Sequence, residues 1–271
     1  MISEMNKPFR LKSGYDMPVL GLGTWELTGK TCEDTIRKAV ELGYRHIDTA
    51  EHYENESEIG QALKNFDRDK LFITSKVSPK NFAKQDMLKA CRRSLTKLGT
   101  DYLDLYLLHW PNDDIPIDGT LEAMQQLIEK GMIRSAGLSN FDVERIRQIL
   151  SVSSVPICNL QLEYHPFTHR EDLPQFCQKE EIAITAYSPL ARGRVFENPT
   201  IKQIADKYSK SAAQISLRWL LQKGNIVIPK ASSEQHLRDN MQIFDWKLNR
   251  EDMENIDDIE SRQRLVDTRY T

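Results

Sequence analysis

The regular alternation of two kinds of segment constrains the fold of this 271-residue chain more than any other feature. Short runs rich in apolar and β-branched residues are typical of parallel strands that are buried on both faces. Eight such runs occur: GLGTW (21–25), HIDTA (46–50), LFITSKV (71–77), LDLYLLH (103–109), SAGLSN (135–140), ICNLQLEY (157–164), AITAYSP (183–189) and NIVIP (225–229). Segments with helical spacing separate them, over residues 32–43, 85–99, 120–131, 141–150 and 211–224. The first three end at glycine, a common helix stop.

This alternation, with no break in composition, predicts one α/β domain over residues 1–271. Right-handed crossovers close eight parallel strands into a (β/α)8, or TIM, barrel. FRLKSGYDMPVL (9–20) predicts an N-terminal β-hairpin that turns at Ser13-Gly14 and closes the barrel floor. A doubly wound Rossmann sheet is the alternative. Its fingerprint would have to be GLGTWELTG (21–29), which lacks the third glycine that close helix packing requires.

Composition excludes several classes of function. A formal charge of −3 argues against a nucleic acid or an anionic membrane as the main partner. No apolar stretch reaches the roughly 18 residues that span a bilayer, and the start MISEMNKPFR does not resemble a signal peptide. We therefore expect a cytoplasmic protein and, without an identifiable apolar surface stripe, a monomer. The cysteines form no CxxC pair and are expected to be reduced and packed: Cys32, Cys91, Cys158 and Cys177.

Polar residues follow the predicted strands in succession. In a barrel of this kind, catalytic groups lie at the carboxyl ends of the strands. These ends carry Asp48, Lys76, His109, Ser139-Asn140, Gln161, Tyr187-Ser188 and Lys230. Each side chain alone could be a helix cap, a turn residue or a hydrogen-bonded core residue. Their recurrence at matching positions predicts a single site at one mouth of the barrel.

The residue types at this mouth suit the reduction of a carbonyl group, which needs a hydride donor and a proton donor for the developing alkoxide. Tyrosine donates a proton from a reference pKa of about 10. A nearby ammonium lowers that pKa, and a carboxylate keeps the ammonium charged and oriented. Tyr53, Lys76 and Asp48 supply these three roles. His109 can orient the substrate oxygen by a hydrogen bond.

These motifs resemble the aldo-keto reductase family, from the hairpin to about residue 246. GYRHIDTAEHYENE (43–56) is similar to the first family signature, with Asp48 and Tyr53 in its catalytic positions. ITSKV (73–77) and LLHWP (107–111) resemble the segments that carry the family's lysine and histidine. RSAGLSNF (134–141) is similar to the second signature, and YSPLARG (187–193) is similar to the loop whose tyrosine stacks on the nicotinamide. Ala136 and Leu160 depart from this pattern, which usually has a larger aliphatic residue and an asparagine there.

The resemblance implies reduction of aldehydes and ketones to alcohols by hydride transfer from NAD(P)H, with Tyr53 as general acid. The nicotinamide carboxamide would bind Ser139, Asn140 and Gln161, with Tyr187 beneath the ring. The ribose and pyrophosphate would contact Gly23, Thr24, Ser188 and Leu190. Arg192 and Arg194 are candidate pyrophosphate partners, because a guanidinium binds phosphate in a bidentate manner.

The segment IPKASSEQHLRDN (228–240) resembles the family's site for the adenosine 2′-phosphate. Its predicted binding residues are Lys230, Ser232, Ser233, His236 and Asn240. His236 stands where the family has arginine, and a neutral histidine lacks arginine's permanent charge and forked geometry. Arg238 lies two residues further on, on a different helix face. We therefore expect NADPH/NADP as the cofactor, with discrimination against NADH reduced and dual use possible.

The predicted substrate is a small-molecule carbonyl compound. Trp25, His52 and Trp110 lie where the family lines its substrate pocket, and two indoles suit aromatic or aliphatic aldehydes. The loops over residues 111–118 and 191–199 are short, which predicts an open mouth and broad substrate acceptance.

Two other classes of function fit the sequence less well. The first is a catalytically weak NADP-binding sensor or accessory barrel, which the complete catalytic set disfavours. The second is a barrel metallohydrolase, which needs clustered histidine and carboxylate ligands. His165 and His169 are the nearest histidine pair, and Pro166 between them disfavours a helical ligand arrangement. No metal ligands are therefore predicted.

Overall fold

The strands form one closed barrel. The computed structural model of the protein describes residues 7–169, 172–260 and 264–265. Eight parallel strands lie in the order β10-β9-β8-β7-β6-β5-β4-β3. Their bounds are β3 (Gly21–Gly23), β4 (His46–Asp48), β5 (Phe72–Val77), β6 (Leu105–Leu108), β7 (Ala136–Ser139), β8 (Ile157–Glu163), β9 (Ala183–Tyr187) and β10 (Ile226–Val227). A parallel bridge between Leu20 and Val227 joins the two ends of the sheet, and Gly23 N donates to Pro229 O at 3.2 Å. The predicted (β/α)8 barrel is thereby confirmed.

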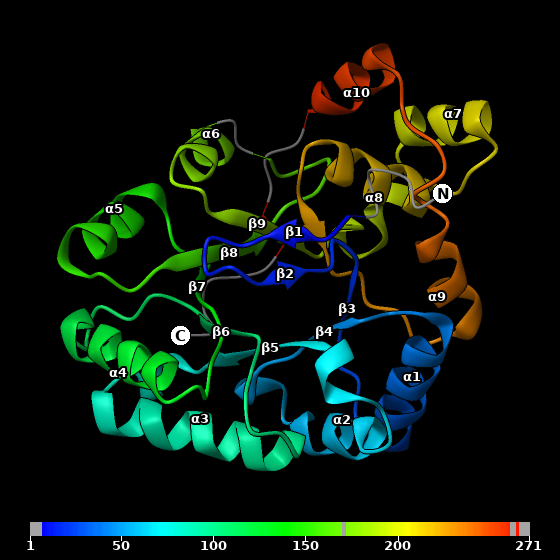
Figure 1. Ribbon diagram of the computed structural model, residues 1–271. Helices are drawn as coiled ribbons and strands as arrows, with labels where there is room; N and C mark the ends of the chain where they lie inside the picture. Colours follow the sequence, from blue (N-terminus) through cyan, green and yellow to red (C-terminus); the bar gives the residue numbers. More distant parts are fainter. Residues whose placement is uncertain (1–6, 170–171, 261–263, 266–271) are drawn as a thin grey trace.

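Helices surround the strands (Figure 1). They are α1 (Gly29–Leu42), α2 (Glu56–Leu63), α3 (Lys84–Leu98), α4 (Ile117–Glu129), α5 (Val143–Val152), α6 (Asp172–Lys179), α7 (Pro199–Tyr208), α8 (Ala212–Gln222), α9 (Glu234–Met241) and α10 (Arg250–Asp257). All five predicted helices are present. Gly43 and Gly99 end α1 and α3 in the left-handed conformation, with φ of 115° and 63°, which glycine adopts without a steric penalty.

The N-terminal hairpin closes the barrel floor, as the sequence predicted. Its strands β1 (Phe9–Arg10) and β2 (Asp16–Met17) pair antiparallel, and Gly14 turns between them at φ 88°. Leu11 and Met17 of the hairpin are buried against residues of the barrel strands, most of them at the amino ends: Phe72, Leu105, Leu107, Cys158, Ala183 and Ile226. In Figure 1 the hairpin lies across the barrel strands. The site must therefore open at the opposite mouth.

The main core lies between the strands and the helices. Ile47 and Leu138 of the strands and Ile36 of α1 are fully buried there, which explains why the strand sequences read as continuous apolar runs. The four cysteines are free and buried, as expected for packing residues. Within the described residues, no helix is long and apolar enough to cross a bilayer, and no group of three or more histidine, cysteine or carboxylate side chains has a metal-binding arrangement.

Candidate active site

A buried lysine lies at the centre of the barrel mouth. Lys76, from β5, donates from Nζ to Asp48 Oδ1 at 2.6 Å, to Thr49 O at 2.8 Å and to Tyr53 Oη at 3.3 Å. Asp48 ends β4, and Tyr53 ends the short helix η2 (Glu51–Tyr53) that follows it. The side chains of Lys76 and Asp48 are 0% and 2% exposed. The three predicted acid–base residues are thus held in one hydrogen-bonded chain.

Burial and charge act in opposite directions on the pKa values of this chain. Burial raises the pKa of Tyr53 above its ordinary value of 10.0, and the Lys76 ammonium lowers it by less. The sequence correctly predicts the direction of the lysine's effect, but burial outweighs it, so the free protein holds a protonated phenol. Burial lowers the pKa of Lys76, whereas Asp48 and Tyr53 raise it by more, to above 10.5. Lys76 is therefore charged at neutral pH.

His109 follows β6 and faces the tyrosine. Its ring centroid lies 5.7 Å from that of Tyr53, with the planes at 72°, and its backbone N donates to Val77 O at 3.2 Å. Burial, reinforced by the positive charge of Lys76, holds the pKa of His109 well below its ordinary 6.5. His109 is consequently a neutral imidazole, which can donate a hydrogen bond from one ring nitrogen and accept one at the other.

The amides predicted to bind nicotinamide meet on the other side of the mouth. Gln161, from β8, donates from Nε2 to Asp48 Oδ2 at 2.7 Å. Asn140, after β7, donates from Nδ2 to His109 O and to Ser139 Oγ, both at 3.0 Å. Tyr187 Oη donates to Asn140 Oδ1 at 2.8 Å. Asn140 N donates to Gln161 O at 3.0 Å, which joins the two amide residues and, through Gln161, links them to the Asp48 carboxylate.

One cavity of about 510 Å³ contains most of the predicted site. The predicted residues that line it are Gly23, Thr24, Trp25, Asp48, His52, Tyr53, His109, Trp110, Ser139, Asn140, Gln161, Tyr187, Ser188, Leu190, Arg192 and Lys230. Lys76 lies behind Asp48 and Tyr53. A Cβ atom at Gly23 would lie 2.7 Å from Ile228 O, so a side chain there would clash with the backbone that follows the neighbouring strand β10.

Aromatic rings form the wall next to Tyr53. The Trp25 indole stacks on His52 with centroids 6.1 Å apart and 12° between planes. It meets the Tyr53 ring edge-on at 4.8 Å. Trp110 lies on the same cavity and is almost fully buried. The three predicted substrate residues thus line the same cavity as Tyr53, with Trp25 packed against the tyrosine ring.

The residues predicted for the adenosine end do not all reach this cavity. Ser233 caps α9 by accepting a hydrogen bond from His236 N at 3.2 Å, and both side chains are exposed, as is that of Ser232. Asn240 is buried and lies against the Tyr44 hydroxyl. Arg194 is exposed and is not among the described residues that line the cavity, unlike Arg192.

The sequence reasoning missed two charged residues of the mouth. Glu26 lines the cavity, and its Oε2 lies 3.5 Å from Lys230 Nζ; its φ of 61° is left-handed, which no local motif indicated. Arg264 follows α10 and donates from Nη2 to Asn140 Oδ1 at 2.7 Å. No motif in the last segment of the chain pointed to that contact.

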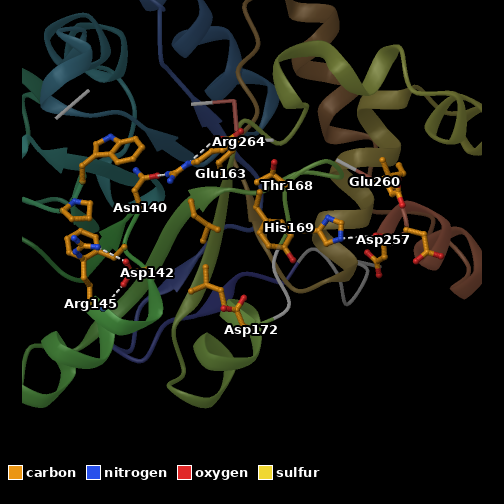
Figure 2. Close-up of a pocket in the computed structure, with 18 of the residues that line it drawn as sticks. Asn140, Asp142, Arg145, Glu163, Thr168, His169, Asp172, Asp257, Glu260 and Arg264 are labelled. Carbon is orange, nitrogen blue, oxygen red and sulfur yellow. Dashed lines mark hydrogen bonds and ion pairs between the residues drawn. The ribbon is translucent and has the colours of Figure 1, made fainter. Parts of the chain in front are cut away.

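A second cavity, of about 1120 Å³, adjoins the first and shares Trp110 and Asn140 with it. Figure 2 shows Arg264 between Asn140 and Glu163 at its edge. Elsewhere on its wall, His169 Nε2 lies 3.1 Å from Asp257 O, and Arg145 donates to Asp142 at 2.8 Å.

Comparisons with known proteins agree with this geometry. The Aldo/keto reductase family model matches residues 19–261. The glyoxal reductase of Bacillus subtilis (strain 168) is 38% identical over 269 residues, which cover 98% of this chain and 97% of the relative. The NADP-dependent D-sorbitol-6-phosphate dehydrogenase of Malus domestica is 36% identical over 292 residues, covering 94% of each chain. The aldose reductase of Schistosoma japonicum has a similar structure, with a TM-score of 0.92 at 34% identity, over 97% of this chain and 95% of that one.

The fold and these matches define an oxidoreductase that acts on carbonyl and alcohol groups with a nicotinamide cofactor. The chain belongs to the aldo/keto reductase family.

Proposed function

We propose that this enzyme reduces aldehydes and ketones with Tyr53 as the general acid. The observation that carries the proposal is the hydrogen-bonded chain from Asp48 through Lys76 to the Tyr53 hydroxyl, at 2.6 and 3.3 Å. A nicotinamide cofactor, when bound, supplies the hydride. The carbonyl carbon then gains the hydride, and its oxygen gains the Tyr53 proton, so that the alcohol is neutral.

Residues of the chain itself hold the proton and donate it to the substrate. Tyr53 is protonated at neutral pH because burial raises its pKa, so the acid is present in the form that donates. As the proton leaves, the Lys76 ammonium stabilises the phenolate that forms. Asp48 keeps that ammonium in place at 2.6 Å. His109, held neutral, is suited to donate a hydrogen bond to the substrate oxygen and so to direct it at Tyr53.

The donor set of the cavity fits a nicotinamide dinucleotide. Ser139, Asn140 and Gln161 offer hydroxyl and amide groups that complement a carboxamide, and the Tyr187 ring offers a stacking face. The cations Arg192 and Lys230 on the same cavity complement phosphate. Gly23 lines the same cavity. We assign these residues, with Thr24, Ser188 and Leu190, to cofactor binding.

The charges at the adenosine end support NADPH binding with reduced discrimination against NADH. Lys230, the cation expected to contact the 2′-phosphate, is paired with Glu26 at 3.5 Å. Arg238 donates to Glu234 at 2.6 Å, and His236 carries no permanent charge. A 2′-phosphate would therefore meet carboxylates as well as cations, which lowers the advantage of the phosphorylated cofactor.

Small aldehydes are the substrates that the aromatic wall of Trp25, His52 and Trp110 fits best. Apolar contacts supply the affinity, and Tyr53 and His109 supply the direction. The relative named glyoxal reductase acts, by its name, on a small dialdehyde, which supports the same class here.

The test is oxidation of NADPH by the purified enzyme with a panel of aldehydes, ketones and keto-sugars, followed by absorbance. We expect turnover with several aldehydes and the highest kcat/KM among small or aromatic ones. Binding of NADP+ without turnover of any carbonyl compound would instead favour a sensor or accessory barrel.

A further inference from the structure

The carboxylate of Glu51 joins the two segments that carry the proposed general acid and its lysine. Glu51 begins η2, two residues before Tyr53. Its Oε2 accepts a hydrogen bond from the backbone N of Ser78 at 3.1 Å, and Ser78 lies two residues after Lys76. The carboxylate therefore ties the chain just before the phenol to the chain just after the ammonium.

Two further side chains hold this carboxylate. Asn81 ends the short helix η4 (Pro79–Asn81) after β5, and its Nδ2 lies 2.9 Å from both Oε1 and Oε2 of Glu51. Arg93 of α3 donates from Nη2 to Oε1 at 2.9 Å. Burial raises the pKa of Glu51, but hydrogen bonds from Arg93, Asn81 and Ser78 lower it by more, to below its ordinary 4.5. Glu51 is therefore an ionised carboxylate at neutral pH, with only 14% of its side chain exposed.

The Tyr53 hydroxyl has little else to fix its position. Within the described part of the chain it has one hydrogen bond, from Lys76 Nζ at 3.3 Å, which is longer than the 2.6 Å between Lys76 and Asp48. The helix η2 is a single turn of three residues, and hydrogen bonds in such turns have poor geometry. The position of the phenol therefore depends on the packing of its ring and on the contacts that hold η2 against β5.

We propose that Glu51 is a positioning residue, which keeps the Tyr53 hydroxyl within reach of the Lys76 ammonium. The inference rests on the proposed role of Tyr53 as general acid. Glu51 acts through position, because the charges that shift the pKa of Tyr53 are those of Lys76 and Asp48. Without the Glu51 carboxylate, η2 is free to move away from β5, and the phenol is poorly aligned for proton transfer. A displacement of about 1 Å at a reacting group can lower a rate about a hundredfold.

The experiment measures reduction of a reactive aldehyde by the full-length enzyme, together with the Kd of NADP+. Rates are expressed per NADP+-binding site, so that loss of folded protein does not lower kcat. In Glu51→Ala, which removes the acceptor of all three donors, we expect kcat to fall by at least about tenfold. The Kd of NADP+ should stay within about twofold, since Glu51 is not among the described residues that line the cavity. Glu51→Gln keeps the length and one acceptor oxygen, so it should restore part of the loss.

A double-mutant comparison separates positioning from a merely structural role. If Glu51 acts through the Tyr53 hydroxyl, adding Glu51→Ala to Tyr53→Phe should change the residual rate by less than about twofold. An anchor that serves stability alone would lower the melting temperature of Glu51→Ala and leave its kcat per binding site at the wild-type value. That result would overturn the proposal, as would an equal loss of rate in the presence and absence of the Tyr53 hydroxyl.

The matched control is Glu122→Ala. This carboxylate also pairs with a cation of α3, Lys84, at 2.6 Å, but it belongs to α4 and not to η2. Its kcat and Kd should stay at wild-type levels. If Glu51→Ala does not fold, Glu51→Gln decides: a fall in kcat of at least about threefold with an unchanged Kd supports the proposal, and a wild-type kcat contradicts it.

Failure of the proposed function would look different. The wild-type enzyme would then reduce no carbonyl compound, or Tyr53→Phe would keep its kcat. If only the role of Glu51 is wrong, turnover by the wild-type enzyme and its loss in Tyr53→Phe both remain, and Glu51→Ala has the kcat of the wild type.

Discussion

The Lys76 amine lies 3.3 Å from the Tyr53 hydroxyl, but of the two only the tyrosine lines the cavity. A substrate therefore meets the phenol and never the ammonium. In the proposed mechanism, the charge of Lys76 acts mainly when the phenol loses its proton, because the buried lysine is already paired with Asp48. Such an arrangement stabilises a transition state more than it stabilises a bound aldehyde.

Replacing the acid should abolish turnover and spare binding. In Tyr53→Phe, we expect kcat to fall by at least about a thousandfold, because the proton donor is lost while the ring and its packing remain. Steady-state kinetics with a reactive aldehyde measures the loss, and the Kd of NADP+ should stay within about twofold of wild type. Retention of more than about a tenth of the wild-type kcat would show that another group donates the proton.

The pH dependence of reduction should have one alkaline limb. Burial raises the pKa of Tyr53 above 10.0, and a general acid works below its pKa, so kcat/KM falls only as the pH rises towards that value. His109 has a pKa well below 6.5 and adds no limb near neutrality. We expect a flat profile from about pH 6 to 9. An inflection near pH 6.5 that disappears in His109→Gln would contradict the neutral imidazole.

Cofactor choice should respond to Glu26. In Glu26→Gln, the carboxylate beside Lys230 is lost, so the ratio of kcat/KM for NADPH to that for NADH should rise. Because the pair is exposed, at 66% for Glu26 and 42% for Lys230, we expect a rise of only about two- to fivefold. Glu254→Gln on α10 is the matched control. An unchanged or lower ratio, or a wild-type preference for NADPH above about a thousandfold, would refute the reduced discrimination.

Acid should destabilise the barrel through His46. Burial lowers the pKa of this histidine from 6.5 to about 4. Between those values the unfolded chain binds a proton that the folded chain excludes, so the free energy of unfolding falls as the pH drops through this window. The loss for this one residue is about 3 kcal/mol. Urea unfolding over the window should show a weaker pH dependence in His46→Gln; an identical dependence would exclude His46 as a cause.

The sequence predicts the barrel well because buried parallel strands leave a strong local signal. All eight strands are present, but each is shorter than its apolar run. For example, residues 103–109 were expected as a strand, and β6 spans only Leu105–Leu108. The runs end where the chain enters the mouth, and His109 there belongs to the site. Apolar character continues past the last ladder hydrogen bond, so it cannot mark the strand's end.

The contacts that the sequence could not predict are made by residues far apart in the chain. Arg264 and Asn140 are separated by 124 positions, and Lys230 and Glu26 by 204. Neither Arg264 nor Glu26 belongs to a local motif, because each comes close to its hydrogen-bond partner only when the barrel closes. Three of the residues proposed as catalytic, Asp48, Lys76 and His109, were predictable because they lie at the ends of consecutive strands, which the barrel brings together.

The hydrogen bond from Gln161 to Asp48 crosses from β8 to β4 and spans 113 residues of sequence. The first half of the barrel carries the residues proposed for acid–base chemistry, and the second half carries the amides proposed for the cofactor. A chimera with a crossover between β6 and β7 therefore takes the aspartate from one parent and the glutamine from the other, so both parents must carry this pair for the hydrogen bond to form. When this enzyme is recombined with its relatives, that pair therefore restricts which parents are compatible.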